Sequence, residues 1–207
     1  MNKEKIAVLV DTCCDVPQTF VEQYHMYVIP LKVIYKDAEY LDGVDITPEQ
    51  VYQGLEKEVP KTSLPNGEQI NQIFDQIRTD GYEKVIAITL SSGLSGTNNM
   101  IHLIADQIPD LDVFIMDTKN ISIGGGFHAI QAARYIEEGL SFEEIKEKLM
   151  RGIAQCKVCL LYTSYPAFLF NLSVLVNEPI TVICTWSYCG RSMQRSALRV
   201  QQWGLCV

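Results

Sequence analysis

The sequence predicts an α/β fold: a mostly parallel sheet flanked by helices, followed by a short irregular C-terminal segment. Three apolar runs, at residues 5–10, 84–89 and 112–116, are each followed by a polar loop and then by a helical pattern. Strands that are apolar along their whole length are typical of sheets covered on both faces. The repeated order of strand, loop and helix favours parallel strands joined by right-handed crossovers.

Composition divides the chain near residue 150. The whole chain of 207 residues carries a net charge of −8, which argues against a nucleic-acid-binding protein. Residues 151–207 hold five basic residues and one acidic residue, so the first 150 residues carry a net charge of −12. Five of the seven cysteines also lie in that last segment. We therefore predict one domain at residues 1–152 and a separate region at residues 153–207.

The first third of the chain begins with the strand at 5–10 and a polar turn at 11–17. Pro17 suits the first turn of a helix that ends near Tyr24. A second strand is expected over 26–35, where Pro30 indicates an edge position or a bend. The next predicted elements are a short hairpin arm at 40–42 and a helix that opens with a capping box at Thr47 and Gln50 and ends before Pro60.

The middle of the chain alternates loops with regular elements. A second hydroxyl-rich loop at 62–66 ends at Asn66, which can cap a helix. A capping box at Ser141 and Glu144 opens the last predicted helix. The expected order is helix 67–80, strand 84–89, loop 91–97, helix 98–107, strand 112–116, loop 117–126, a helix to 138 and a helix to 152.

The polar loops are the candidate ligand site. Ligands of parallel α/β sheets bind beyond the carboxyl ends of the strands, where the loops at 11–17, 91–97 and 117–126 must lie. The loop at 62–66 is expected beside them. The loop at 91–97 runs into a helix N-terminus, where unpaired N–H groups and the helix dipole favour an anion. The pattern predicts a bound phosphate or carboxylate.

A small hydrolase or phosphotransferase that uses the same loops is the alternative. Residues 93–97 resemble a nucleophile elbow, but the second glycine falls one place early and Thr97 stands where it should be. The histidines do not support a triad, because His25 lies between elements and His102 and His128 lie inside predicted helices.

Metal and cofactor sites are not predicted. Asp11, Asp15 and Asp117 could bind Mg²⁺, but aspartates at strand ends commonly cap the next helix, and we favour that structural role. The glycines at 124–126 suit either a phosphate cradle or close helix packing, and neither a Walker lysine nor a full dinucleotide motif accompanies them. The spacing of Cys156, Cys159, Cys184 and Cys189 does not match a zinc site.

The N-terminus shows no signal peptide, so we expect a cytoplasmic protein with free thiols. Residues 158–177 form an uncharged stretch as long as a membrane span. Polar residues and Pro166 interrupt that stretch, so stable membrane insertion is not expected.

Four motifs together resemble the DegV family of bacterial fatty-acid-binding proteins over residues 1–152. They are Asp11-Thr12-Cys13-Cys14-Asp15-Val16-Pro17, Thr62-Ser63-Leu64-Pro65, Ser91-Ser92-Gly93-Leu94-Ser95-Gly96-Thr97, and Asp117-Thr118 with Ser122 and Gly124 to Gly126. The resemblance implies an N-terminal α/β domain and a second domain, with a long-chain fatty acid between them.

The resemblance also implies a role for named residues. Thr62 and Ser95 are expected to hydrogen-bond the fatty-acid carboxylate, and the residues expected nearby are Thr12, Ser63, Gly96, Thr97, Ser122 and Gly124. It further implies a lipid-binding protein rather than an enzyme. Such a protein would present the carboxylate to a separate kinase subunit, which makes an acyl phosphate for phospholipid synthesis.

Two departures from the family pattern stand out. Thr12 occupies a position where the family usually has serine, and two cysteines follow it. Residues 153–207 lack a recognisable Gly-Gly-Arg-type turn and second domain. We expect this region to be a truncated or aberrant remnant of that domain, which could leave the chain without function on its own; a divergent short domain is the alternative.

Overall fold

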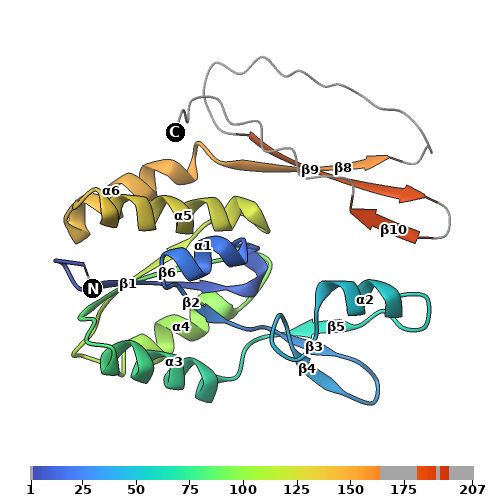
Figure 1. Cartoon of the computed structure of the whole chain (residues 1–207), viewed down its shortest axis with the longest axis horizontal. Coiled ribbons are helices and arrows are strands. Elements are labelled where there is room, and N and C mark those ends of the chain that lie inside the picture. Colours follow the sequence, from blue (N-terminus) through green and yellow to red (C-terminus); the bar gives the residue numbers. More distant parts are fainter. Residues whose placement is uncertain (1, 164–180, 190–191, 196–207) are drawn as a thin grey trace. The chain divides into compact units, whose positions relative to one another are not determined.

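The computed structural model describes residues 2–163, 181–189 and 192–195, with side chains for residues 2–156 and 158 (Figure 1). The chain divides into two compact units, Met1–Ile153 and Ala154–Val207, and each is described by itself.

The first unit is built on a parallel sheet in the order β2-β1-β6-β7. Its strands are β1 (Ile6–Asp11), β2 (Tyr27–Ile29), β6 (Lys84–Thr89) and β7 (Asp112–Asp117). In the register of the sheet, Leu9 pairs with Ala87, and Ala87 pairs with Ile115. The predicted α/β fold with a parallel sheet is confirmed.

Helices cover both faces of this sheet (Figure 1). Val8, Val10 and Ile88 pack with α1 (Gln18–Gln23), α5 (Ile123–Glu137) and α6 (Phe142–Ile153). Leu9 and Ala87 pack on the other face with α3 (Gly67–Thr79) and α4 (Thr97–Ala105). Alternate residues of each strand therefore enter different cores, which explains why the strands are apolar throughout.

A small antiparallel sheet corrects two predictions. The expected strand at 26–35 is two strands, β2 and β3 (Lys32–Ile34), because Pro30 has no N–H group and separates them. The expected loop at 62–66 begins with β5 (Lys61–Ser63), which pairs with β3, as β4 (Glu39–Leu41) does on the other side. Helix α2 (Pro48–Gly54) lies between β4 and β5 in the chain. As predicted, β2 is an edge strand.

Three of the predicted helix starts are confirmed by side-chain caps. Thr47 and Gln50 form a capping box on α2, and Asn66 caps α3. Ser141 and Glu144 exchange hydrogen bonds at the start of α6.

The second unit contains three strands among its described residues, although we predict an irregular segment there. These are β8 (Lys157–Thr163), β9 (Thr181–Cys189) and β10 (Ser192–Arg195), in the order β10-β9-β8. Most of the uncharged stretch at 158–177, and the side chains of Cys159, Cys184 and Cys189, lie outside the described residues. In the part of the chain that is described, no helix has the length and apolar character needed to cross a membrane.

Candidate functional site at the carboxyl edge of the sheet

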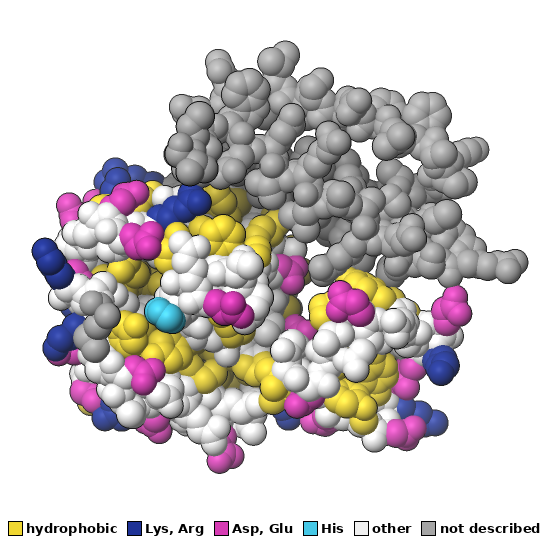
Figure 2. Space-filling view, viewed as in Figure 1, with side chains coloured by type: hydrophobic (Ala, Val, Ile, Leu, Met, Phe, Trp, Pro, Cys, Tyr) yellow, Lys and Arg dark blue, Asp and Glu magenta, His cyan; other side chains and the backbone are white. Residues whose placement is uncertain are grey.

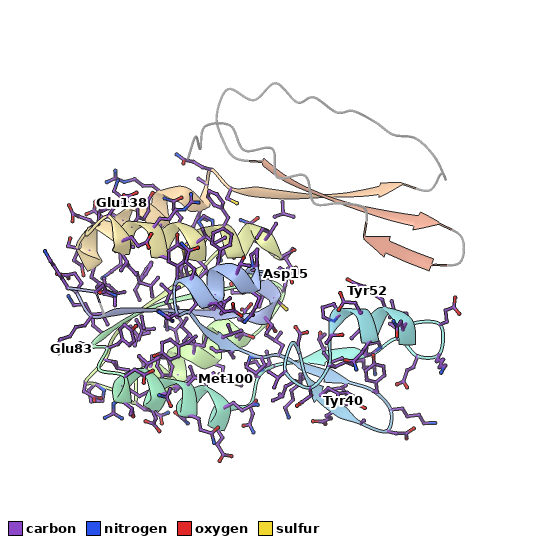
Figure 3. All side chains as sticks on the ribbon, viewed as in Figure 1. Asp15, Tyr40, Tyr52, Glu83, Met100 and Glu138 are labelled. Carbon is purple, nitrogen blue, oxygen red and sulfur yellow. The ribbon has the colours of Figure 1, made fainter. Side chains whose placement is uncertain are left out.

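The carboxyl ends of β1, β6 and β7 lie at one edge of the parallel sheet, as predicted. We refer to residues 11–17, 90–97 and 117–123, which follow these three strands, as the edge loops. Asp15 marks this edge in Figure 3, and Glu83, which precedes β6, lies at the opposite edge. Hydrogen bonds join the edge loops to one another.

Asp11 joins the first edge loop to the second. Its Oδ2 accepts a hydrogen bond from the backbone N–H of Leu90 at 2.9 Å. Asp11 is only 1% exposed, and this burial raises its carboxyl pKa to about 6. The predicted structural role fits this geometry, but the hydrogen bond goes to a neighbouring loop: Asp11 is the N-cap of the 3-10 turn η1 (Thr12–Cys14) without a side-chain capping bond.

Asp117 joins the third edge loop to the second. Its Oδ1 accepts from the backbone N–H groups of Ser92 and Lys119, both at 3.1 Å. Its Oδ2 accepts from the Ser92 hydroxyl and from Lys119 Nζ. Partial burial opposes ionisation, but the hydrogen bonds from Lys119 and Ser92 outweigh it and lower the pKa of Asp117 to about 2. Our prediction missed this cluster, because nothing in the local pattern pairs residue 92 with residue 117.

Ser122 connects the third edge loop with the first. Its N–H donates to the carbonyl of Cys13 at 2.8 Å, and its hydroxyl donates to Asp15 Oδ2 at 2.6 Å. Ser122 has φ 58° and ψ −148°, a region populated mainly by glycine. The neighbouring contacts therefore hold a strained residue at the start of α5.

Ser95 lies in front of α4 and is the central residue of the predicted site. Its Oγ accepts from the backbone N–H of Thr97 at 3.2 Å and is 2.8 Å from Thr97 Oγ1. Thr97 is fully buried, so its hydroxyl and N–H group are fixed partners for Ser95 Oγ. If the Thr97 hydroxyl donates in this pair, the Ser95 hydroxyl keeps its own proton for a ligand.

Helices α4 and α5, which begin at this edge, lack side-chain caps on their N-cap residues. Gly96 is the N-cap of α4 and Ser122 is the N-cap of α5, and neither makes a side-chain capping bond. Helices α2 and α3, by contrast, both start with complete capping boxes. At the start of α4, the N–H of Thr97 donates instead to Oγ of Ser95, the residue before the N-cap, and at the start of α5 the N–H groups of Gly125 and Gly126 donate to the carbonyl of Ser122.

The segment with Thr62 lies against the Ser95 loop. The side chain of Leu64 would be 3.4 Å from a Cβ placed on Gly96, so the two segments are in contact. Thr62 and Ser63 lie on β5 with exposed side chains. Thr12 Oγ1 accepts from the backbone N–H of Leu31 at 3.2 Å and so ties the first edge loop to the connection between β2 and β3.

Two glycines of the 124–126 run are required by packing. A Cβ on Gly126 would lie 2.4 Å from the carbonyl oxygen of Cys14, and one on Gly125 would lie 2.8 Å from Cys14 Sγ. Helix α5 therefore approaches η1 too closely for any side chain at these positions. Gly124 is also buried in the first turn of α5.

The catalytic and metal alternatives gain no support from the described residues. His128 is buried in α5 beside Gly152, and burial lowers its pKa to about 4. The Ser95 hydroxyl lies within hydrogen-bond distance of the Thr97 hydroxyl, which is not a general base. Within the described part of the chain, no group of His, Cys, Asp or Glu side chains is arranged to hold a metal ion.

The edge loops carry more acidic than basic side chains. Acidic side chains are spread over the described face of the molecule in Figure 2. The edge loops themselves contain Asp11, Asp15 and Asp117 and a single cationic side chain, Lys119. Two surface hollows lie elsewhere: one is lined by residues such as Ile6 and Tyr82, and the other by residues such as Tyr27 and Ile73.

The chain matches a known protein family over most of its length. A family model described as "Uncharacterised protein, DegV family" matches residues 5–164. The chain belongs to the DegV family. The match continues past residue 152, where the motif resemblance ends. A DegV domain-containing protein from Clostridium acetobutylicum is 38% identical over 155 residues, which cover 75% of this chain and 55% of that protein.

Solved DegV structures have the same fold. DegV from Bacillus subtilis, described as a fatty acid binding protein, matches with a TM-score of 0.69 and 29% identity over 75% of this chain and 55% of that chain. A Thermotoga maritima protein, described as revealing fatty acid binding function, matches with a TM-score of 0.67 and 32% identity, covering 73% and 56%. The chain thus spans about half the length of the DegV relatives that it matches.

Proposed function

We propose that this chain binds a long-chain fatty acid and holds its carboxylate through the hydroxyls of Ser95, in the second edge loop, and Thr62, on β5. The observation that carries the proposal is the position of Ser95 directly before α4, where its Oγ accepts from the N–H of buried Thr97 and lies 2.8 Å from the Thr97 hydroxyl. Fatty acid binding by the solved relatives supports this choice of ligand.

The physical chemistry of the edge suits a carboxylate. A carboxylate removed from water needs several hydrogen bonds, and hydroxyl and backbone donors supply them without a buried lysine. The acyl chain would contribute most of the affinity, at ~0.8 kcal/mol for each buried CH₂ group. The edge loops would then set the orientation of the head group.

We further propose that the bound carboxylate is presented to a separate kinase subunit of a fatty acid kinase in the cytoplasm, for phospholipid synthesis. The family resemblance and the exposed position of Thr62 and Ser63 support this proposal. Adding such a subunit and ATP to the chain loaded with palmitate should produce acyl phosphate. Acyl phosphate formed equally without the chain would contradict the proposal.

Native mass spectrometry of the chain expressed in bacteria tests the binding proposal. We expect a co-purifying mass in the range of bacterial fatty acids, and a rise in melting temperature on titration with palmitate or oleate. The double variant Thr62→Ala/Ser95→Ala should lose both signals. No fatty acid in the wild-type chain, even with the second domain of a relative grafted on, would contradict the proposal.

The enzyme alternative has its own test. Turnover of acyl esters or of nucleotide by the isolated chain, abolished by Ser95→Ala, would favour a hydrolase or phosphotransferase over a binding protein.

A further inference from the structure

Both carboxylate oxygens of Asp117 accept hydrogen bonds from other groups of the protein. Four donors converge on it: two backbone N–H groups on Oδ1 at 3.1 Å, and the Ser92 hydroxyl and Lys119 Nζ on Oδ2. Its side chain is 19% exposed. Because the acceptor positions are occupied and the charge is paired with Lys119, Asp117 can lie close to a bound anion without competing for the same donors.

The turn that carries Ser95 depends on this carboxylate. The N–H groups of Leu94 and Ser95 both donate to the carbonyl of Ser91, at 2.9 and 3.2 Å, and close a tight turn. Asp117 binds Ser92 inside that turn through both its N–H and its hydroxyl. The N–H of Ser91 adds one bond to the carbonyl of Asn120 at 2.8 Å. Asp117 therefore makes two of the hydrogen bonds that hold the turn against the end of β7, and Asn120 and Lys119 make the others.

We propose that Asp117 is a positioning residue for carboxylate recognition. It fixes the Ser91–Ser95 turn and thereby places the Ser95 hydroxyl at the start of α4, where the carboxylate would bind. This inference rests on the proposed function, because it assumes that a fatty-acid carboxylate occupies that point. Its signature is selective: loss of Asp117 should weaken recognition of the head group and leave contacts with the acyl chain intact.

A comparison of palmitate with hexadecanol isolates the head group, because the two ligands share the same chain. Their affinities are measured by competition against a fluorescent fatty acid. We expect the wild-type chain to prefer palmitate, and Asp117→Ala to bind palmitate about tenfold more weakly while hexadecanol binding is unchanged.

Two further variants complete the design. Asp117→Asn keeps an acceptor for the two backbone N–H groups and should lose less of the preference, and it carries the test if the alanine variant does not fold. Asp112→Asn removes an exposed carboxylate at the other end of β7 and should behave as the wild type.

The possible outcomes separate the two proposals. If Asp117→Ala keeps the preference for palmitate, or weakens both ligands equally, Asp117 has no specific role in head-group recognition and the inference is overturned. If the wild-type chain shows no preference for palmitate, the proposed carboxylate site fails first and the inference fails with it.

Discussion

Ser95 and Thr97 are joined by two contacts: their hydroxyl oxygens lie 2.8 Å apart, and the backbone N–H of Thr97 donates to Ser95 Oγ at 3.2 Å. Thr97 is fully buried, whereas Ser95 is half-buried at the carboxyl edge of the sheet. The pair links the core of the domain to the proposed ligand. When the Thr97 hydroxyl donates to Ser95 Oγ, the Ser95 hydroxyl is left as an oriented donor for that ligand.

Replacing Ser95 by alanine should weaken fatty-acid binding by ~1–3 kcal/mol, because a desolvated carboxylate would lose a donor. Isothermal titration calorimetry with palmitate measures the change. Ser141→Ala provides a matched control, since Ser141 caps α6 away from the edge loops. Equal affinity of Ser95→Ala and wild type would remove Ser95 from the site.

Replacing Thr97 by valine should have a smaller effect, with palmitate affinity lowered by ~0.5–1.5 kcal/mol. Valine keeps the shape of threonine and the backbone N–H, so only the hydroxyl that orients Ser95 is lost. Thr79→Val is the control, because the Thr79 hydroxyl bonds the carbonyl of Asp75 within α3. The same calorimetric titration applies, and a larger loss for Thr97→Val than for Ser95→Ala would contradict the supporting role of Thr97.

Gly126→Ala should destabilise the folded chain by ~3 kcal/mol, because the added methyl group would lie 2.4 Å from the carbonyl oxygen of Cys14. Urea unfolding followed by circular dichroism measures the free energy of unfolding. Gly54→Ala is the matched control: a Cβ there would have Tyr35 Oη at 3.8 Å as its neighbour, and stability should be unchanged or higher. An unchanged urea midpoint for Gly126→Ala would show that α5 does not pack as closely on η1 as described.

His128 should make stability depend on pH. Burial lowers its pKa from 6.5 to about 4 in the folded chain, so the unfolded chain takes up a proton first as the pH falls. Stability should therefore fall between about pH 6.5 and pH 4, by up to ~1.4 kcal/mol per pH unit. Urea unfolding at a series of pH values measures this slope.

The ionisation of Asp11 has the opposite effect on the dependence of stability on pH. Its pKa is raised to about 6 from 3.8, so its contribution to stability is lost as the pH rises through that range.

A comparison of wild type with His128→Leu isolates the histidine. The free energy of unfolding of the wild type minus that of His128→Leu should decrease as the pH is lowered. A pH-independent difference between wild type and His128→Leu would contradict the buried neutral histidine.

Local patterns predicted most of the fold. Uninterrupted apolar runs located β1, β6 and β7, and capping residues such as Thr47 and Asn66 located helix starts, because these signals are contained in a few neighbouring residues. The small sheet was only partly predicted. Val33 pairs with Thr62 across nearly 30 residues, and no local pattern specifies such a pairing.

The position of the edge loops was predicted, but the hydrogen bonds between them were not. Parallel strands bring their carboxyl ends together, so the topology places the loops that contain Ser95 and Ser122 at the same edge of the sheet. The partners of Asp11 and Asp117 do not follow, because a strand-end aspartate can cap its own helix or bond a neighbouring loop. Only the three-dimensional arrangement shows that both aspartates bond the loop after β6.

The most direct test of the central claim is a ¹³C NMR spectrum of palmitate labelled at the carboxyl carbon and added to the chain. We predict a bound resonance distinct from free palmitate, which shifts in Ser95→Ala and in Thr62→Ala and is unmoved in Ser141→Ala. This result would show that the carboxylate lies close to the hydroxyls of Ser95 and Thr62. The absence of a bound resonance, or an identical one in all three variants, would contradict the account.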